Sequence, residues 1–488
     1  MSGCPHCGGT GGPAGPPAQR ARAAEVAGSA TGRHADELAD YAARIERLAL
    51  DLGFVHHAVE YELVPDRFMM ETAVYGLPVR MPHWSFGVCY IRELVQRTMG
   101  LSRIFEVMFP GDPCHAYLVD ANSLPENVLV VAHVLGHADF SARNTLFVRS
   151  MRMAGGHILE QAAARAHRIE QALTDHGQAR VEAVLDAALA LEAHVDLQRE
   201  LHRKPYPVGA VEDIPVVDDA FRSRWHALPG EAPTPQRRGR RPGVPPHPEY
   251  DLVWFIAHYG PELDDWERDI FLAVREESFY FHPVFACQIM NEGWASYWHA
   301  RLLREADFLP NDLYLAAIKA HSDVVRPHAA GRTIALSVNP YHLGFSMWER
   351  IVAAQGLEAA RRICADEDDF GFIRNHLDRA LADELDLFVY EASDDGQIKV
   401  VSRDLRDVRE AILAPKFNFG APRVAATSVA HDGTLTLTHD HAGDGRGLDL
   451  KRAQRVLDYV VQLWRRPVVL LTVDDRGQPE RLKAAPGS

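Results

Sequence analysis

Two histidines one helical turn apart are the residues of this sequence best suited to metal chemistry. His133 and His137 lie four positions apart in the segment His-Val-Leu-Gly-His. On an α-helix this spacing places both imidazoles on one face, where they can reach a single metal ion. Such pairs are also common on polar helix faces, so for this segment alone an ordinary surface helix is the alternative interpretation.

A second segment adds a carboxylate and a third imidazole. Glu292, Ser296 and His299 follow at spacings of four and three in NEGWASYWH, so they share one helix face among apolar and aromatic neighbours. A carboxylate in such surroundings is costly unless it is paired or ligated. The sequence therefore predicts one divalent metal, zinc or iron. The predicted ligands are His133, His137, Glu292 and His299, the last as a fourth ligand or a proton shuttle. A buried polar network without metal is the alternative.

Two known kinds of metal site have this composition. One is the His₂Glu zinc site of peptidases, and the other is the two-histidine, one-carboxylate site of non-haem iron enzymes. In zinc peptidases with the HExxH motif, the glutamate takes a proton from water. Val134 occupies that position here and cannot do so. The valine favours iron, unless Asp139, Glu126 or His299 supplies the base, and Asp139 is poorly placed for it.

Two further segments combine a ring with a glycine, as a pocket wall or a tight turn would. They are HWSFG, which contains His83, and NPYHLG, which contains Tyr341. The candidate catalytic residues are His299, Asp139, His83 and Tyr341. Core or turn structure is the alternative for both segments. The sequence has no P-loop, no GxGxxG after a strand and no GxSxG, so we predict no nucleotide cofactor and no serine hydrolase chemistry.

Helical periodicity dominates the elements that must position these residues. It predicts helices from about 34 to 53, from about 125 through the His133 segment, and over much of 250–330 and 338–390. Short β-type runs appear after about 391, around one helix. We predict a mainly α-helical body, α+β overall, with a small C-terminal α+β domain. The predicted boundaries are a disordered Gly/Pro-rich tail at 1–33, a helical core at 34–390 with a Pro/Arg loop at 228–248, the α+β domain at 391–475, and a flexible tail at 476–488.

Composition limits the class of protein. The 488 residues are 47% hydrophobic and 24% charged, which suits a chain with a large core. The net charge of −15 argues against general electrostatic binding to nucleic acid or anionic lipid. No apolar run is long enough to cross a membrane, no secretory signal is evident, and the six cysteines form no disulfide framework. We therefore predict a cytoplasmic protein. Cys4 and Cys7 form a single CxxC without a second half-site.

Several motifs in one order resemble the stage V sporulation protein R (SpoVR) family. These motifs are HWSFG, HxxGH continuing into ADFSARN, MNEGWASYWH, NPYHLG and the closing LDLKRAQRVLDYVVQLWRRPVVLLTV, and the resemblance covers about residues 35–475. The resemblance points to His83, Trp84, His133, His137, Asn291, Glu292, Trp294, His299, Asn339 and Tyr341. This chain departs from the family pattern after HxxGH, at Ala138, Asp139 and 141–143, and in the loop at 228–248. These departures indicate a divergent subgroup.

The resemblance implies a link to the spore cortex, which is a peptidoglycan layer, and no fixed reaction. The leading hypothesis is a metal-dependent enzyme that acts on a small molecule or a cell-wall precursor. A second hypothesis is a non-haem iron oxidative enzyme of specialised metabolism. A third is a non-catalytic assembly or regulatory protein with a structural metal site or polar network, which binds a protein partner through its C-terminal domain.

Overall fold

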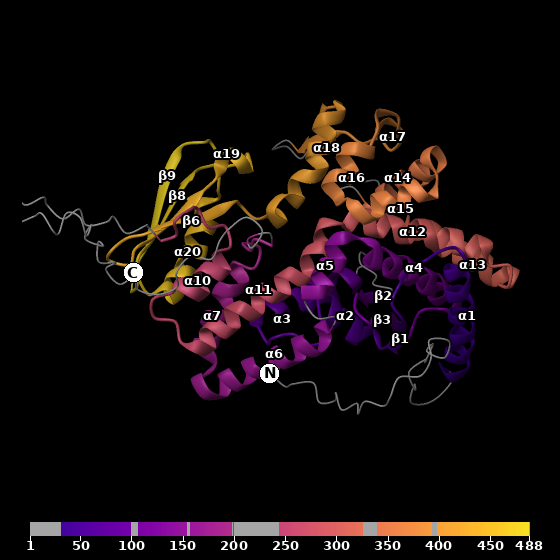
Figure 1. Ribbon diagram of the computed structural model, residues 1–488, viewed down its shortest axis with the longest axis horizontal. Coiled ribbons are helices and arrows are strands. Elements are labelled where there is room, and N and C mark those ends of the chain that lie inside the picture. The colour runs from indigo at the N-terminus through magenta and orange to yellow at the C-terminus, as the bar shows by residue number, and fades with distance from the viewer. Residues whose placement is uncertain are drawn as a thin grey trace, which may run out of the picture. The chain divides into compact units, whose positions relative to one another are not determined.

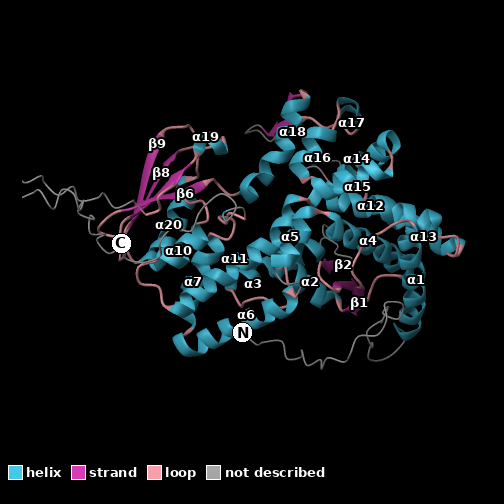
Figure 2. Cartoon of the chain, viewed as in Figure 1, coloured by secondary structure: helices cyan, strands magenta, loops and turns pink. Residues whose placement is uncertain are grey.

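The computed structural model describes residues 31–98, 106–153, 157–197, 199, 244–325, 339–392 and 398–487. Helices make up most of these ranges, and a small sheet lies near the C-terminus (Figures 1 and 2). The predicted fold class is thereby confirmed. The tail at 1–30, with Cys4 and Cys7, and residues 228–243 of the Pro/Arg loop lie outside the described residues.

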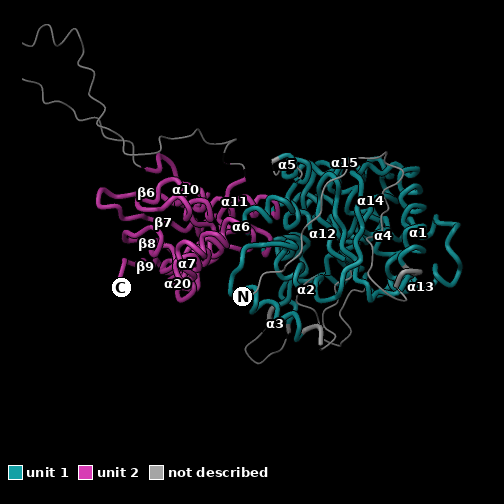
Figure 3. Tube along the Cα trace, turned by 90° about the horizontal axis from the view of Figure 1, so that it is seen from below, with its two compact units in different colours: residues 1–166, 282–414 teal, residues 167–281, 415–488 magenta. Residues whose placement is uncertain are grey.

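The described chain forms two compact units (Figure 3). The first contains residues 1–166 and 282–414, and the second contains residues 167–281 and 415–488. Two helices pass from one residue range to the other, α6 (Ile158–His176) and α11 (Asp265–Ala286). None of the helices in the described ranges is both long and apolar enough to span a membrane.

The first unit is built around α4 (Leu124–Arg143) and α12 (Gln288–Glu305). α4 is buried from Asn127 to Ser141, as expected for a helix that is apolar on nearly all sides. Its start follows the sequence prediction, with Pro125 in the first turn and a capping box between Ser123 and Glu126. The other helices of this unit are α1 (Thr31–Asp51), α2 (Asp66–Tyr75), α3 (Trp84–Thr98), α5 (Thr145–Met153), α13 (Asn311–Val324), α14 (Pro340–Gln355), α15 (Leu357–Asp366), α16 (Asp369–His376), α17 (Arg379–Glu384) and α18 (Leu405–Leu413).

A three-stranded sheet lies beside α4 in the same unit. Its order is β1 (Val59–Val64), β3 (Cys114–Val119), β2 (Glu106–Phe109). β1 runs parallel to β3, and β2 runs antiparallel to it with Glu106 opposite Leu118. A separate hairpin joins β4 (Val389–Ala392) to β5 (Ile398–Ser402).

Close backbone contacts fix how the central helices cross. A Cβ added to Gly136 of α4 would lie 2.7 Å from the Cα of Ala295 on α12. A Cβ on Gly293 of α12 would collide with the backbone of Gly344 on α14, and one on Gly344 would collide with the carbonyl oxygen of Ile289. The three helices therefore approach more closely than larger side chains would permit.

The second unit contains the C-terminal sheet. Its strand order is β6 (Val424–Val429), β7 (Leu435–His439), β8 (Val468–Val473), β9 (Pro479–Ala484). β7 and β8 are parallel, and the crossover between them is α20 (Leu450–Trp464). The other elements are α7 (Gln178–Ala190), α10 (Leu252–Tyr259), α19 (His441–Asp444) and a 3₁₀ segment at Ala414–Gly420, which begins at the last residue of the first unit.

Two predicted boundaries differ from the structure. β9 lies within 476–488, so the prediction of a flexible tail there is wrong: its residues pair with β8 from Val473↔Pro479 to Val468↔Ala484. The predicted domain start at 391 falls inside the first unit, and residues 167–281 of the predicted helical core belong to the second unit. An antiparallel bridge between Glu249 and Ala426 is one contact that joins the two parts of this unit.

Candidate metal centre

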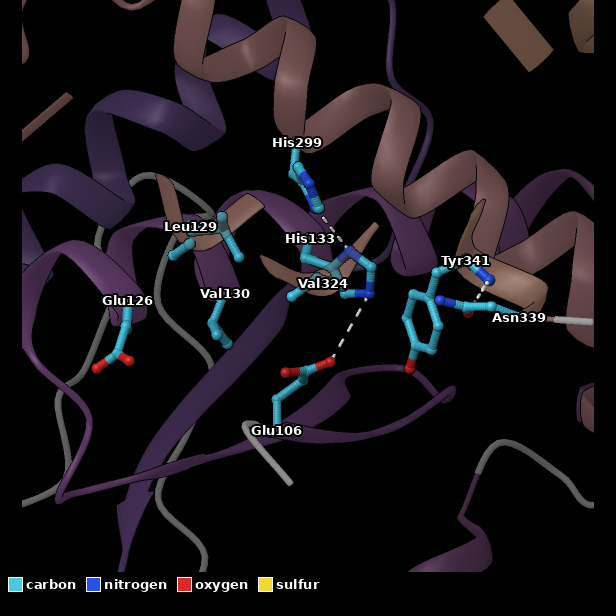
Figure 4. A pocket seen from close by; sticks show the side chains of 10 residues that line it. Glu106, Glu126, Leu129, Val130, His133, His299, Val324, Asn339 and Tyr341 are labelled. Carbon is cyan, nitrogen blue, oxygen red and sulfur yellow. Dashed lines mark hydrogen bonds and ion pairs between the residues drawn. The ribbon is translucent and has the colours of Figure 1, made fainter. Parts of the chain in front are cut away.

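Two imidazoles and two carboxylates converge in the first unit. The Nε2 atoms of His133 and His137 lie 3.6 and 3.5 Å from Oε2 of Glu292, and Oε1 of Glu106 lies 3.7 Å from Nε2 of His133. Single donor atoms of Glu106, His133 and His137 all lie within 4.8 Å of one another. The two histidines come from α4, Glu292 comes from α12 and Glu106 from β2 (Figure 4 shows the Glu106–His133 pair).

These distances fit a shared metal better than direct hydrogen bonds. Zinc–nitrogen and zinc–oxygen bonds of about 2.1 Å in a tetrahedral site put neighbouring donors about 3.4 Å apart. The observed separations of 3.5–3.7 Å are close to that edge length and too long for good hydrogen bonds. Oε2 of Glu292 is also buried without a hydrogen-bond partner. An ion shared by His133, His137 and Glu292 would supply the partner that this oxygen lacks.

Asn291 fixes which nitrogen of His137 faces the cluster. The Nδ1 atom of His137 lies 2.8 Å from Oδ1 of Asn291. A carbonyl oxygen only accepts, so Nδ1 carries a proton, and Nε2 is the nitrogen that faces Glu292. Metal-bound histidines usually have such an acceptor behind them. The contact with Asn291 is therefore compatible with metal binding through Nε2.

The two carboxylates differ in their affinity for protons. Burial raises the pKa of Glu106 above its ordinary value, although His133 and His137 partly oppose this. Burial would also raise the pKa of Glu292, but the charge of His137 and the contacts with His133 and His137 lower it well below its usual range. Glu292 is therefore the ionised member of the pair, as a metal ligand must be.

The N-terminal turn of α12 is held in place from outside the cluster. The carboxylate of Asp369 accepts hydrogen bonds from the backbone amides of Ile289 and Met290, at 2.9 Å each. Trp348 donates its indole N–H to the carbonyl oxygen of Met290 at 3.0 Å. These contacts set the position of the turn from which Asn291 and Glu292 project.

His299 is placed behind His133 rather than among the ligands. Its Nδ1 lies 2.8 Å from Nδ1 of His133, and its Nε2 lies 2.5 Å from Nδ1 of His321 on α13. Burial and the neighbouring histidines hold the pKa of His299 well below its ordinary value. Because imidazole neighbours occupy both ring nitrogens, the geometry does not favour His299 as a fourth ligand.

A cavity of about 410 Å³ opens beside the cluster. Glu106, His133 and Tyr341 line its polar side, and its apolar wall is formed by Leu129, Val130, Ala320 and Val324. The ring of Tyr341 stacks over His133, with centroids 6.1 Å apart (Figure 4). The charge of Glu292, together with burial, raises the pKa of Tyr341 well above its ordinary value, so its hydroxyl remains a hydrogen-bond donor.

Two predicted catalytic residues do not reach this cavity. Asp139 is fully buried and accepts hydrogen bonds from the backbone amide of Val55, from Arg143 and from the indole of Trp294. His83 lies just before α3, where its Nδ1 is 2.6 Å from the hydroxyl of Ser85. Neither is among the residues that line the cavity. Both therefore lie outside the cavity, and their catalytic roles remain predictions.

Two residues of the site carried no signal in the sequence. Glu106 lies on a four-residue strand 27 positions before His133, so no helical spacing connects the two. His321 is a lone histidine on α13. By contrast, the structure brings together His133, His137, Glu292, His299 and Tyr341, all of which the sequence singled out.

These features define a mainly helical protein with a histidine–carboxylate cluster in its helical body and a small C-terminal sheet. The model of the SpoVR-like protein family matches residues 33–420, and that of the SpoVR-like C-terminal domain matches residues 423–475. The chain belongs to the SpoVR-like family. It is 26% identical over 490 residues to the uncharacterized protein YcgB of Escherichia coli (strain K12), covering 92% of this chain and 94% of YcgB. No solved structure is significantly similar to it.

Proposed function

We propose that this SpoVR-like protein is a metal-dependent hydrolase. His133, His137 and Glu292 would hold one divalent ion, preferably zinc, and Glu106 would serve as the general base. The observation that carries the proposal is the second carboxylate, whose Oε1 lies 3.7 Å from Nε2 of His133. It supplies the base that Val134 cannot provide within the helix.

A divalent ion bound there would act as a Lewis acid and make a water molecule acidic enough to attack an acyl group at neutral pH. The partly buried carboxylate of Glu106 would accept a proton from water and return it to a leaving group. Its raised pKa suits that exchange, because a base works best when its pKa approaches the working pH. The protonated hydroxyl of Tyr341 can donate a hydrogen bond to a developing oxyanion.

Oxidative iron chemistry is the second candidate. A pair of histidines with one carboxylate also suits non-haem iron. From the sequence, iron was favoured over zinc because the His133 segment contains no general base. If Glu106 is the general base, that argument for iron no longer applies. A structural, non-catalytic metal site is less consistent with a cavity that reaches His133.

The biological context follows from the family alone. We propose a cytoplasmic role in cell-wall or spore-cortex formation, with an amide or ester of a cell-wall precursor as the substrate class. A protein partner bound by the C-terminal domain is compatible with this role.

The first experiment measures metal content and hydrolysis together. The protein is purified without a metal-binding tag, analysed for zinc and iron, and assayed with p-nitrophenyl acetate as a generic ester. We expect about one zinc per chain, strongly reduced in Glu292→Gln. Glu106→Gln should keep the zinc and lose about 10²- to 10⁴-fold in hydrolysis, the usual contribution of a general base.

Glu126→Gln is the matched control. Glu126 lines the same cavity but serves the capping box of α4, and glutamine can fill that role. Its metal content and hydrolysis should equal those of the wild type. Absence of metal from the wild type after reconstitution would overturn the proposal. Iron with oxygen consumption would replace it by the oxidative candidate, and loss of zinc in Glu106→Gln would make Glu106 a ligand.

A further inference from the structure

Three histidines form a continuous row that begins at the candidate metal centre. His133, His299 and His321, here called the histidine row, are joined by contacts of 2.8 Å between two Nδ1 atoms and 2.5 Å between Nε2 of His299 and Nδ1 of His321. His133 and His299 are buried, whereas His321 is partly exposed and packs edge-on against Phe345, with centroids 5.3 Å apart. The row therefore leads away from the cluster to a more accessible residue of α13.

Each neutral imidazole has one N–H donor and one lone pair, so the row has a direction. If His133 offers the lone pair of Nε2 to a metal, its Nδ1 must carry the proton. Nδ1 of His299 must then accept, and Nε2 of His299 must donate. The last acceptor is Nδ1 of His321.

We infer that His321 is a positioning residue of the metal centre, which fixes the proton of His133 on Nδ1 by accepting a hydrogen bond from His299. This inference rests on the proposed metal-dependent function and deepens it. Without an acceptor at position 321, the buried Nε2–H of His299 would have no partner. The opposite tautomer of His299 would then be favoured, and its Nδ1–H would face the Nδ1–H of a metal-bound His133. Ligation by His133 would be weakened accordingly.

His137 is held in a similar way, but the acceptor behind its Nδ1 atom is the side-chain amide oxygen of Asn291 and not a second histidine. Asn291 accepts from Nδ1 of His137 at 2.8 Å and leaves Nε2 free to ligate. Both candidate histidine ligands thus have their Nδ1 protons held from behind and their Nε2 atoms turned towards Glu292. Such supporting acceptors typically change metal affinity by about 10- to 100-fold when they are removed.

The test compares zinc affinity in the full-length wild type, His321→Leu and His321→Asn, by competition with a chelator of known affinity. Leucine cannot accept a hydrogen bond, so zinc binding should weaken about 10- to 100-fold. The Oδ1 atom of asparagine corresponds in position to Nδ1 of histidine and can accept, so this variant should remain close to wild type. His57→Leu, at a histidine of the first unit whose side chain is 41% exposed, should bind zinc as the wild type does.

A second readout separates hydrogen-bond direction from simple packing. Long-range ¹H–¹⁵N correlation spectra of the zinc-loaded wild type should show the proton of His299 on Nε2. A proton on Nδ1 would overturn the inference, and so would wild-type affinity in His321→Leu or equal losses in the leucine and asparagine variants. If the wild type binds no zinc at all, the proposed function fails and the inference fails with it. If the wild type binds zinc and His321→Leu binds it equally well, only the inference fails.

Discussion

At the scale of single residues, the two carboxylates of the cluster differ in their pKa shifts. Both are partly buried, yet His137 and His133 lower the pKa of Glu292, whereas desolvation dominates at Glu106 and raises its pKa. Groups of one chemical type whose environments move their pKa values apart are a common basis for dividing acid, base and ligand roles. The contrast arises because Oε2 of Glu292 lies close to both imidazoles.

The role of Asp139 can be tested at this scale. Asp139→Ala removes the acceptor for the amide of Val55 at 2.7 Å, for Arg143 at 2.8 Å and for Trp294 at 3.0 Å. Because a buried ion pair loses one partner, the free energy of unfolding should fall by about 3–5 kcal/mol. Urea denaturation measures this, and zinc bound per folded chain should not change.

The control for this prediction is Asp40→Ala. Asp40 is an exposed partner of Arg44 at 3.4 Å, so its loss should cost less than about 1 kcal/mol. Unchanged stability of Asp139→Ala, together with loss of zinc, would restore Asp139 to the site.

Sequence reasoning identified the residues of the cluster that lie on helices and missed those that depend on tertiary contacts. His133, His137, Glu292 and His299 share helical spacings, and spacing alone predicts that they face one side. Glu106 reaches the cluster only because β2 pairs with β3 beside α4. No periodicity connects a strand residue to a helix 27 positions later. The sequence predicted that Asp139 is poorly placed to act as a base, but it could not show that Val55, Arg143 and Trp294 donate hydrogen bonds to its carboxylate.

At the scale of elements, the glycines within the motifs explain how the helices assemble the site. Gly136 lies between His133 and His137 in the sequence and allows α4 to touch Ala295 of α12. Gly293, beside Glu292, allows α12 to touch Gly344 of α14, the helix that carries Tyr341. Each motif therefore contains both a side chain of the cluster and the glycine whose close helix contact positions that side chain. From the sequence these glycines could have been read as turns, because helix–helix contacts leave no local signal.

This argument predicts opposite effects for two glycine substitutions. Gly293→Ala forces a methyl group against the backbone of Gly344, so the free energy of unfolding should fall by about 1–3 kcal/mol or more, with reduced zinc binding as Glu292 shifts. Gly87→Ala on α3 meets no atom within 4 Å, and alanine favours a helix, so stability should rise by about 0.5–1 kcal/mol. Urea midpoints and zinc titrations of both variants check this. Equal effects of the two substitutions would contradict it.

At the scale of the whole molecule, the two units are each made of separated stretches of sequence. The chain leaves the first unit near residue 166, returns near 282 and leaves again near 414. The candidate metal centre lies entirely in the first unit, since Glu106, His133, His137, Glu292 and Tyr341 all fall within its ranges. The sequence predicted a boundary at 391 because β-type residues begin there. A change in residue type along the sequence indicates which kind of element begins, but not which unit that element packs in. The β4–β5 hairpin belongs to the first unit although it is built from β-type residues.

We expect partly buried histidines in both units to make stability depend on pH. Burial lowers the pKa of His282 in the first unit and of His194 in the second to about 4. Unfolded histidine has a pKa of about 6.5, so between these values the unfolded chain binds more protons than the folded one. Stability should thus be fully present above about pH 6.5 and decline as the pH falls towards 4.

The expected loss between pH 7 and pH 5 is up to about 2 kcal/mol for each of these histidines, less where water reaches the ring. Urea unfolding of the wild type at pH 7, 6 and 5, followed by tryptophan fluorescence, measures it. His282→Asn and His194→Asn remove one titrating group each, so each variant should show a smaller difference between pH 7 and pH 5 than the wild type. A wild-type midpoint that stays constant from pH 7 to pH 5 would show that these imidazoles gain protons in the folded protein as readily as in the unfolded chain. Because the two histidines lie in different units, the pair of variants also reports which unit limits the stability of the molecule in mild acid.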